Sequence, residues 1–459
     1  MHFDRHRCKN HKIHLYEYGL IFICQGVYYA GTVGFCGRSG VLIAGKIMEN
    51  MKMYVEKIPW KANYDESQMP AYTLPDVLLC QDGSTVKTSD EWMKKRRPEL
   101  LQMFKDVMYG ELPPLPDRVR YELLSEKRDA RGGKAVRREV RIHLEMNNGR
   151  SHFIDMLYYL PAKTAGKVPV FVGLTFIGNH VVTDEPDIRI TGTAGDQEGN
   201  PIIRERGYQV RRFPIDTILE RGYALAVASY HDIFPDRIDG WENSIYRLFF
   251  QGEELKRPKG YSCIGAWSWG ISRMLDYLET VPEIDSSKAS VFGHSRLGKT
   301  SLWAGVTDER FKLICVNDSG CGGTALSRRL YGETLFSMCC YNTIGKYWFT
   351  DTIEAKSIHP EELPLDQHEL VALVAPRAVA VHSAIEDQWA DPKGEYLSAY
   401  HAGPVFKLFG KTPLESENPP EIEHPVGTDV SYYCRNGKHD LLLSDWLHYM
   451  AMADRIFGK

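Results

Sequence analysis

The stretch Gly293-His294-Ser295-Arg296-Leu297-Gly298-Lys299 decides the fold of this 459-residue chain. It places a serine between two glycines, directly after the apolar run Ala289 to Phe292, which is typical of a buried strand. The glycines let the backbone turn sharply on either side of the serine, so that its hydroxyl is exposed and the following N–H groups can bind an oxyanion. The pattern predicts a nucleophile elbow, the strand-to-helix turn that carries the catalytic serine of an α/β-hydrolase.

The flanking sequence has the element order that this elbow requires. Upstream, residues 267–280 have apolar side chains at helical spacing, and downstream residues 300–305 continue as a helix. A bare Gly-X-Ser-X-Gly match also arises by chance in small-residue loops that close a strand, so the order helix, strand, turn, helix carries the interpretation. The sequence therefore predicts a serine hydrolase that acts on an ester or an amide.

Composition is consistent with a large enzyme domain. With 43% hydrophobic residues the chain can bury a sizeable core, and α/β folds of this length can remain one domain. The net charge of −4 gives no basic excess, which argues against nucleic acid or an anionic membrane as a partner. Basic clusters at residues 94–97 and 128–138 are interpreted as solvated faces because acidic residues flank them.

Residues 1–52 differ from the rest of the chain. They begin with a basic stretch, but the moderately apolar segment 20–36 is broken by glycines, tyrosines and Gln25, so only fragments of an export signal are present. We predict either a degenerate signal or a poorly ordered extension ahead of a true start at Met51 or Met53. Residues 53–459 are predicted to form a single catalytic domain, and no other stretch is long and apolar enough to span a membrane.

The ten cysteines are scattered along the chain. Their spacing fits neither a Cys-X-X-Cys metal site nor a small disulfide scaffold. We expect mostly buried free thiols and no metal site. One or two disulfide bridges are compatible with this expectation.

Strand and helix patterns alternate after residue 97. Residues 98–109 are predicted to be helical, and residues 121–124 and 135–144 to be antiparallel strands at a sheet edge. Continuously apolar runs, which are typical of buried parallel strands, follow at 152–160, 168–174, 223–228, 289–292, 313–316, 378–383 and 405–408. The predicted fold class is α/β, a mainly parallel twisted sheet with helices on both faces in three layers.

A serine nucleophile needs a histidine base, and in this fold the base follows the acid near the C-terminus. The late histidines are His424, His439 and His448. His439 is the predicted base because it lies in the glycine-containing segment 436–440, just before the helix-like segment 445–457. His448 falls within that helix, and His424 in the Pro/Glu-rich loop 413–429.

The acid has candidates at the ends of two strands. An ordinary α/β-hydrolase carries it after the strand before the histidine loop, which indicates Glu386 or Asp387. Asp318, beyond residues 313–316, is the alternative. Each could instead be a carboxylate that caps its loop, and spacing alone leaves the choice open.

From about residue 72 onward the chain resembles the glucuronoyl esterases of carbohydrate esterase family 15, particularly the bacterial members. The resemblance rests on several ordered segments. They are GLTFIGNH (173–180), WSWGISRMLDYLE (267–279), GHSRLGK (293–299), SGCGG (319–323), LPLDQH (363–368) and EDQWADPKGE (386–395). It implies hydrolysis of the ester between 4-O-methyl-glucuronic acid groups of xylan and lignin alcohols, with no metal or organic cofactor.

The resemblance also implies roles for single residues. Ser295 matches the nucleophile, His439 the base, and Asp318 the position of the usual glutamate acid, 23 residues after the serine. Because aspartate is one methylene shorter, Asp387 stays open. We favour Asp318 as the acid, with Asp387 sharing or replacing its role. Arg296 is expected to donate its N–H to the oxyanion and to add positive charge. The resemblance further implies sugar contacts by three residues, which are Lys299, Glu333 and Trp389.

Two other functions remain open at this point. One is a broad or acetyl-type carbohydrate carboxylesterase, and the other is an inactive polysaccharide-binding relative. The expected partner is a glucuronoxylan or lignin-carbohydrate ester, with no nucleic acid and no membrane insertion, and a monomer is expected. The resemblance implies a secreted or periplasmic enzyme.

Overall fold

The computed structural model describes residues 60–459 apart from 193–203, 343 and 358, and three strands nearer the N-terminus. It divides into two compact units, Met1–Lys61 and Ala62–Lys459. In the first unit β1 (Lys12–Tyr16), β2 (Gly19–Cys24) and β3 (Val27–Gly31) form an antiparallel sheet. The rest of the predicted extension, residues 1–52, lies outside the described residues, as do residues 53–59 of the predicted catalytic domain.

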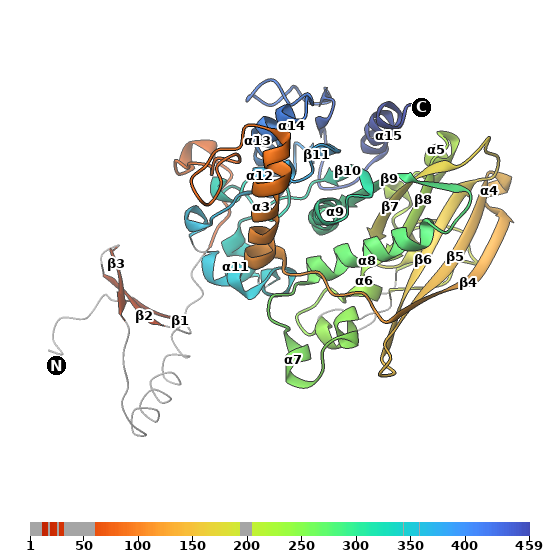
Figure 1. Ribbon diagram of the computed structural model, residues 1–459, viewed down its shortest axis with the longest axis horizontal. Coiled ribbons are helices and arrows are strands. Elements are labelled where there is room, and N and C mark those ends of the chain that lie inside the picture. Colours follow the sequence, from red (N-terminus) through yellow and green to blue (C-terminus); the bar gives the residue numbers. More distant parts are fainter. Residues whose placement is uncertain are drawn as a thin grey trace. The chain divides into compact units, whose positions relative to one another are not determined.

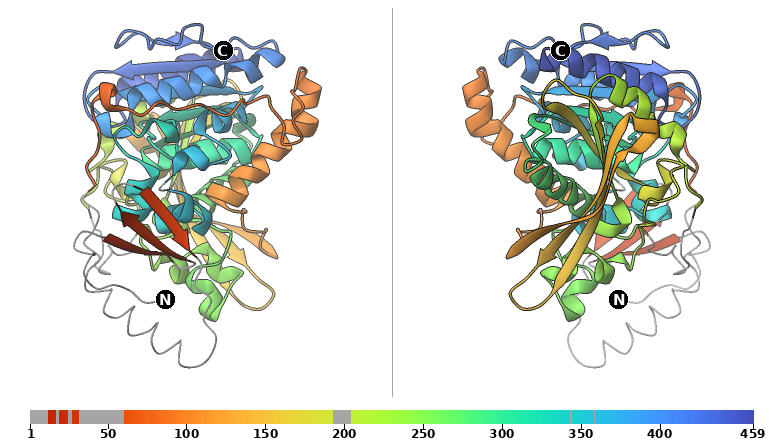
Figure 2. Two further views of the ribbon diagram at one scale, coloured as in Figure 1. Left: turned by 90° about the vertical axis from the view of Figure 1, so that its left-hand side faces the viewer. Right: turned by 90° about the vertical axis from the view of Figure 1, so that its right-hand side faces the viewer.

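A ten-stranded sheet forms the centre of the second unit, in the order β12-β13-β11-β10-β9-β7-β8-β6-β5-β4 (Figure 1). The six neighbours β13, β11, β10, β9, β7 and β8 pair in parallel. β12 at one edge and β6, β5 and β4 at the other pair antiparallel. The antiparallel side is made of long twisted strands (Figure 2). The bounds are β4 (Arg118–Asp129), β5 (Ala135–Glu145), β6 (Ser151–Pro161), β7 (Val168–Thr175), β8 (Ala224–Ser229), β9 (Ile284–His294), β10 (Phe311–Asn317), β11 (Ala378–Ala384), β12 (Val426–Gly427) and β13 (Val430–Arg435).

Helices cover both faces of this sheet. One core packs α8 and α9, which lie side by side (Figure 1), against side chains such as Val172 and Val291. The other packs α5 and α15 against Phe171 and Phe292. The bounds are α3 (Arg97–Phe104), α5 (Ile215–Glu220), α8 (Cys263–Leu278), α9 (Arg296–Thr307), α11 (Asp351–Lys356), α12 (Gln367–Ala372), α13 (Pro392–His401), α14 (Gly403–Leu408) and α15 (Leu443–Phe457). Shorter helices are α2 (Ser89–Glu91), α4 (Ala130–Gly133), α6 (Tyr230–Ile233), α7 (Gly252–Lys256) and α10 (Gly345–Trp348).

Strand register brings the ends of the central strands to one edge. Asn317 at the end of β10 is paired with His294 on β9 and with His382 on β11. Residues that follow these strands therefore meet at the same edge, where open α/β sheets bind their ligands. Ser295, Asp318 and Asp387 all follow one of these three strands.

The three-layer α/β architecture confirms the predicted fold class, but two strand predictions were wrong. Residues 405–408 belong to helix α14, with Pro404 in its first turn, because a four-residue apolar run does not distinguish a strand from a buried helix. Residues 152–160 do form a strand, β6, but it pairs antiparallel with both β5 and β8. The sequence analysis missed β13, which takes the place beside β11.

The prediction of mostly buried free thiols is confirmed among the residues that the structure describes. Cys80, Cys263, Cys315, Cys321 and Cys434 are buried free thiols, and Cys340 is an exposed one. Among the described residues, no helix has the length and apolar character needed to cross a membrane.

Candidate active site

Ser295 lies at the turn between β9 and α9 with φ 60° and ψ −131°, a conformation that non-glycine residues seldom adopt. Its N–H donates to the carbonyl of Asn317 at 2.8 Å, which fixes the turn to the next strand. A Cβ atom on Gly293 would lie 1.9 Å from the Leu297 carbonyl oxygen, so only glycine fits there. The predicted elbow is present, with the serine in the strained geometry that exposes its side chain.

His439 and Asp387 form a hydrogen-bonded pair at the same edge. Asp387 follows β11 and is buried, whereas the His439 side chain, after β13, is 40% exposed. Nδ1 of His439 lies 2.6 Å from Oδ2 of Asp387. The N–H of Glu386 donates to the carbonyl of Gly437 at 3.1 Å, which ties the two loops together. A carboxylate at Nδ1 leaves Nε2 as the nitrogen that can take a proton from a nucleophile.

His294, directly before Ser295, places His439 beside the elbow. The two imidazole rings have centroids 4.4 Å apart. Nδ1 of His294 lies 2.5 Å from the side-chain oxygen of Asn317, and burial lowers the pKa of His294 well below its usual value. His294 is therefore a neutral ring that packs against the predicted base, a role that the sequence analysis missed although the residue adjoins the motif.

Asp318 lies close to this pair but has a different hydrogen-bond partner. Its Oδ2 accepts from the guanidinium of Arg435 at 3.2 Å, and Arg435 also donates to Asp445 at 3.1 Å. Burial, and then Glu395 and Asp387, raise the pKa of Asp318 well above its usual value. The structure thus pairs His439 with Asp387 and Asp318 with Arg435, whereas the sequence analysis leaned to Asp318 as the acid.

Asp318, Asp387 and His439 each bring one potential ligand atom within 4.8 Å of the others. Two carboxylates and an imidazole are donor types that metal ions accept. The same three groups also make the acid and base of a hydrolase, with Asp387 already bonded to His439. The expectation of no metal stays a prediction.

Arg296 is held over an aromatic and acidic cluster. Its guanidinium forms an ion pair with Asp236 and lies 5.0 Å from the centroid of the Trp348 ring and 5.9 Å from that of Phe176. Trp348 Nε1 also donates to Asp236, at 2.7 Å. Burial raises the pKa of Asp236, but Arg296 and Trp348 outweigh burial and hold it below its usual value. Asp236 thus fixes the guanidinium of Arg296 beside the elbow. The sequence analysis predicted a role for Arg296 but not for Asp236.

The loop after β7 also reaches this place. The Phe176 ring makes an edge contact with His294, with centroids 5.9 Å apart, and it packs near Arg296. A second oxyanion donor is expected, from the sequence, in residues 176–178, in the loop after the apolar run 168–174. Phe176 thus lies beside the elbow, and the donor itself stays a prediction.

Lys299, Glu333 and Trp389, for which sugar contacts are expected from the resemblance, lie together, and their contact with a sugar stays a prediction. The buried Nζ of Lys299 lies 2.8 Å from Oε2 of Glu333 and donates to the carbonyl of Ser319 at 2.6 Å. Trp389 Nε1 donates to the other oxygen of Glu333 at 3.2 Å. The N–H of Glu333 donates to the Trp389 carbonyl at 2.7 Å, so the two segments run against each other. The group offers donors, an acceptor and an indole face to a hydroxylated ring.

Glu395 holds the Ser-Gly-Cys-Gly-Gly segment (319–323) in place by hydrogen bonds. The sequence analysis missed this role. The Oε1 atom of Glu395 accepts from the backbone N–H groups of Ser319 and Gly320 and from the hydroxyl of Thr324, at 2.7–3.0 Å. Its Oε2 accepts from Ser383 at 2.6 Å. Glu395 therefore holds the loop after β10 against β11. A glutamate within a helix gives no sequence signal for such a role.

Fold and site together define the class of protein. A mainly parallel sheet with a serine on a strained strand-to-helix turn, and a histidine-aspartate pair on the next loops, is the arrangement of an α/β-hydrolase with a serine nucleophile.

Comparison with known proteins gives the family. The family model "Glucuronyl esterase, fungi" matches residues 237–410. The chain is 39% identical over 422 residues to carbohydrate esterase MZ0003 of an unknown prokaryotic organism, covering 90% of this chain and 96% of that protein. It is 27% identical to 4-O-methyl-glucuronoyl methylesterase 1 of Wolfiporia cocos, covering 77% of each chain.

Solved structures agree with this result. The glucuronoyl esterase from Solibacter usitatus is 39% identical, with a TM-score of 0.80, covering 86% of this chain and all of that chain. A promiscuous CE15 esterase from a marine bacterial metagenome is 40% identical, with a TM-score of 0.78, covering 86% of this chain and 99% of that chain. The chain belongs to carbohydrate esterase family 15, the glucuronoyl esterases, and is a carboxylic ester hydrolase.

Proposed function

We propose that this enzyme hydrolyses esters of glucuronic acid and 4-O-methyl-glucuronic acid, as found in lignin–xylan links, through an acyl-enzyme on Ser295. The observation that carries the proposal is the His439–Asp387 hydrogen bond beside the strained Ser295 turn. The names of its relatives, glucuronoyl methylesterases and glucuronoyl esterases, supply the substrate class.

In the first half of the reaction His439 takes the proton of the Ser295 hydroxyl, and the serine oxygen attacks the uronate carbonyl. Asp387 holds the ring and stabilises the imidazolium that forms. The backbone N–H of Arg296 and a donor from residues 176–178 stabilise the oxyanion, and the guanidinium of Arg296 adds positive charge nearby. His439 then protonates the departing alcohol.

In the second half a water molecule attacks the acyl-enzyme. His439 accepts a proton from this water, and the tetrahedral intermediate collapses to release the uronate and restore the Ser295 hydroxyl. The product is an anion, whereas the ester was neutral at the same carboxyl. The positive charge of Arg296 therefore favours both the transition state and the product over the substrate.

Asp387 is the proposed triad acid. It makes the hydrogen bond to Nδ1 of His439, while Asp318 accepts from Arg435 and has a raised pKa. Asp318 then supports the site indirectly, because Arg435 also donates to the carbonyl of Lys438 at 2.9 Å, next to the base. Its proposed role is to hold the histidine loop.

The Lys299, Glu333 and Trp389 group is proposed to hold the uronate ring. Lys299 is already paired with Glu333, so it would donate to a sugar hydroxyl while Glu333 accepts from one. A hydroxylated ring with one apolar face also suits the side of an indole. The polymeric substrate places the proposed action outside the cytoplasm, as a secreted or periplasmic enzyme, and we propose that the enzyme acts as a monomer.

A broad carboxylesterase is the second candidate, because one 40% identical structure is described as a promiscuous CE15 esterase. The test is to compare kcat/KM for benzyl glucuronate and p-nitrophenyl acetate under the same conditions. The proposal expects the glucuronate ester to be preferred. A preference for the acetate would favour the broad esterase, and no turnover of either ester would favour the inactive polysaccharide-binding relative.

A further inference from the structure

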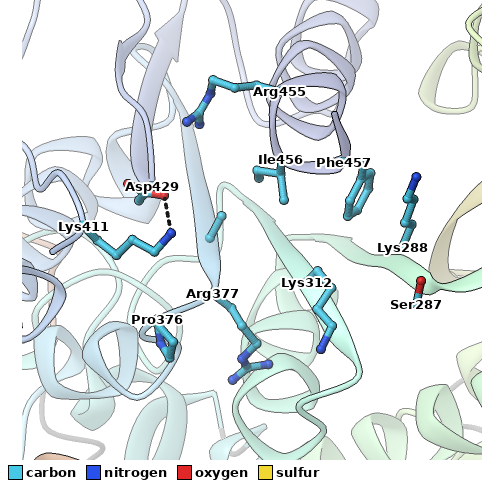
Figure 3. Close-up of a pocket in the computed structure, with 11 residues that line it drawn as sticks. Ser287, Lys288, Lys312, Pro376, Arg377, Lys411, Asp429, Arg455, Ile456 and Phe457 are labelled. Atoms are coloured by element: carbon cyan, nitrogen blue, oxygen red, sulfur yellow. Dashed lines mark ion pairs between the residues drawn. The ribbon is translucent and has the colours of Figure 1, made fainter. Parts of the chain in front are cut away.

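Figure 3 shows the residues that line a cavity of about 580 Å³. The cavity lies at the edge of the sheet where the central strands begin, whereas Ser295 follows the end of β9. We name it the basal cavity, because it lies where β9, β10, β11 and β13 begin. Its volume falls in the range of small-molecule sites. It is lined by Ser287, Lys288, Lys312, Pro376, Arg377, Ala378, Lys411, Asp429, Arg455, Ile456 and Phe457.

Strand register gathers the cations. Leu313 pairs with Ala378, which sets Lys312 beside Arg377. Val379 pairs with Val430, which sets Asp429 just before the next strand, β13. Lys288 lies in the first half of the neighbouring strand β9, just before Ala289, which pairs with Phe311. The last residues of α15 form another wall (Figure 3). The cluster thus follows from strand pairing rather than from one flexible loop.

Backbone carbonyls accept hydrogen bonds from three of these cations. Lys312 donates to the carbonyl of Glu309 at 2.9 Å, and Arg455 donates to that of Thr428. Arg377 donates to the carbonyls at the end of α9 and the start of β10, which belong to Gly305, Asp308 and Phe311. Burial lowers the pKa of Arg377 to about 10 and outweighs the opposing effect of the Glu309 and Asp308 carboxylates, which lie outside the lining.

The described lining of the cavity holds fewer carboxylates than cations. Asp429 is the one acidic residue in the described lining, and it lies 3.4 Å from Lys411. Lys288 lies 3.7 Å from Asp285, which is outside the lining. Five cationic side chains therefore face one lining carboxylate, in a chain whose net charge is −4. Such a concentration of one sign attracts anions.

Ile456 and Phe457 add an apolar wall to these cations (Figure 3). Guanidinium and ammonium groups bind carboxylates, and an aromatic or aliphatic surface packs against the C–H face of a sugar ring. A uronic acid has both features in one unit. An inorganic anion would use the cations but leave the apolar wall without a partner.

We propose that the basal cavity binds free uronate groups of an acidic polysaccharide, apart from the catalytic site. The proposal rests on the proposed function, because the ester at Ser295 is neutral at its carboxyl while unesterified uronates on the same polymer are anionic. Strand ends separate the two places, so a uronate in the basal cavity leaves Ser295 accessible. The cavity would anchor the enzyme to its polymer.

The test compares migration through gels that contain glucuronoxylan with free acid groups or neutral arabinoxylan. The double variant Lys312→Gln and Arg455→Gln removes two cations from the cavity. The control variant, Lys87→Gln and Lys94→Gln, removes two exposed lysines elsewhere. Thermal unfolding checks that all proteins are folded. Turnover of benzyl glucuronate is measured separately, because this small ester carries no free carboxylate to occupy the basal cavity.

The proposal expects glucuronoxylan to retard the wild type and the control variant, with affinity about tenfold weaker in the cavity variant and turnover unchanged. Added salt should weaken the retardation, and glucuronate should compete better than acetate. Equal retardation of folded wild type and cavity variant would overturn the site, and equal competition by acetate would overturn the uronate assignment. If the wild type did not turn over benzyl glucuronate, that result would instead count against the proposed function.

Discussion

Nδ1 of His439 lies 2.6 Å from Oδ2 of Asp387, while Asp318, at the end of the adjacent strand, bonds to Arg435. Two carboxylates thus reach one edge of the sheet, and their hydrogen-bond partners separate their roles. Asp387 can orient the base directly. Asp318 can act on it only through the loop that Arg435 holds.

Replacing each acid by its amide tests this division. Asp387→Asn should lower kcat on benzyl glucuronate by about a thousandfold or more, because an amide no longer stabilises the imidazolium. Asp318→Asn keeps an oxygen for Arg435 and should lower kcat about tenfold or less. Steady-state rates at one pH measure both. A larger loss for Asp318→Asn would return the acid role to that residue.

The two acids also show how far the sequence could predict this site. The places of Ser295 and His439 at this edge could be predicted because a local motif and a glycine-containing loop mark them. Asp318 and Asp387 could not be ranked, because strand pairing brings both to the same edge, as the match of Asn317 with His382 shows. The difference is made by Arg435 on β13, a strand that the sequence analysis missed.

Residues that hold site residues in place could also not be predicted from the sequence. Asp236 and Glu395 lie far along the chain from Arg296 and Ser319, which they bind, and no spacing marks such partners. The central strands were predicted because they are buried on both faces and continuously apolar. The error at residues 405–408 has the same origin, since burial makes a short helix equally apolar.

Asp236 is predicted to set the charge and direction of the Arg296 guanidinium. Asp236→Asn should lower kcat on benzyl glucuronate about tenfold to a hundredfold with little change in KM, because the cation is needed most when the oxyanion forms. The control is Asp239→Asn, an exposed acid nearby that pairs with Arg237. A pure KM effect would place Asp236 in substrate binding instead.

Lys299 should matter for sugars and not for simple esters. Lys299→Ala removes a donor to a sugar hydroxyl, so kcat/KM for benzyl glucuronate should fall about a hundredfold while that for p-nitrophenyl acetate changes little. Glu333→Gln, which keeps the shape of the side chain, should show the same selectivity to a smaller degree. Equal losses on both esters would refute a sugar-binding role and indicate that Lys299 supports the loop through Ser319.

His368 predicts a pH dependence of stability. It is 2% exposed, its Nε2 lies 2.9 Å from the Pro75 carbonyl, and burial lowers its pKa from 6.5 to about 4. Between pH 6.5 and about 4, His368 therefore binds a proton in the unfolded chain but not in the folded protein. Its contribution is present above pH 6.5 and is lost as the pH falls toward 4, by up to about 3 kcal/mol.

Urea unfolding of wild type and His368→Gln at pH about 7.5 and about 5 checks this sign. The wild type should lose more of its free energy of unfolding on acidification than the variant does. Burial raises the pKa of neighbouring Glu369 to about 7, which works in the opposite direction but is present in both proteins. The same loss in both would exclude His368 as the titrating group.

Release of benzyl alcohol from benzyl glucuronate by wild type and Ser295→Ala tests the central claim most directly. The account predicts steady turnover by the wild type and a loss of about 10⁴-fold or more in the folded variant. Turnover that survives in Ser295→Ala would contradict an acyl-enzyme on Ser295, and its absence from the wild type would contradict the glucuronate ester as substrate.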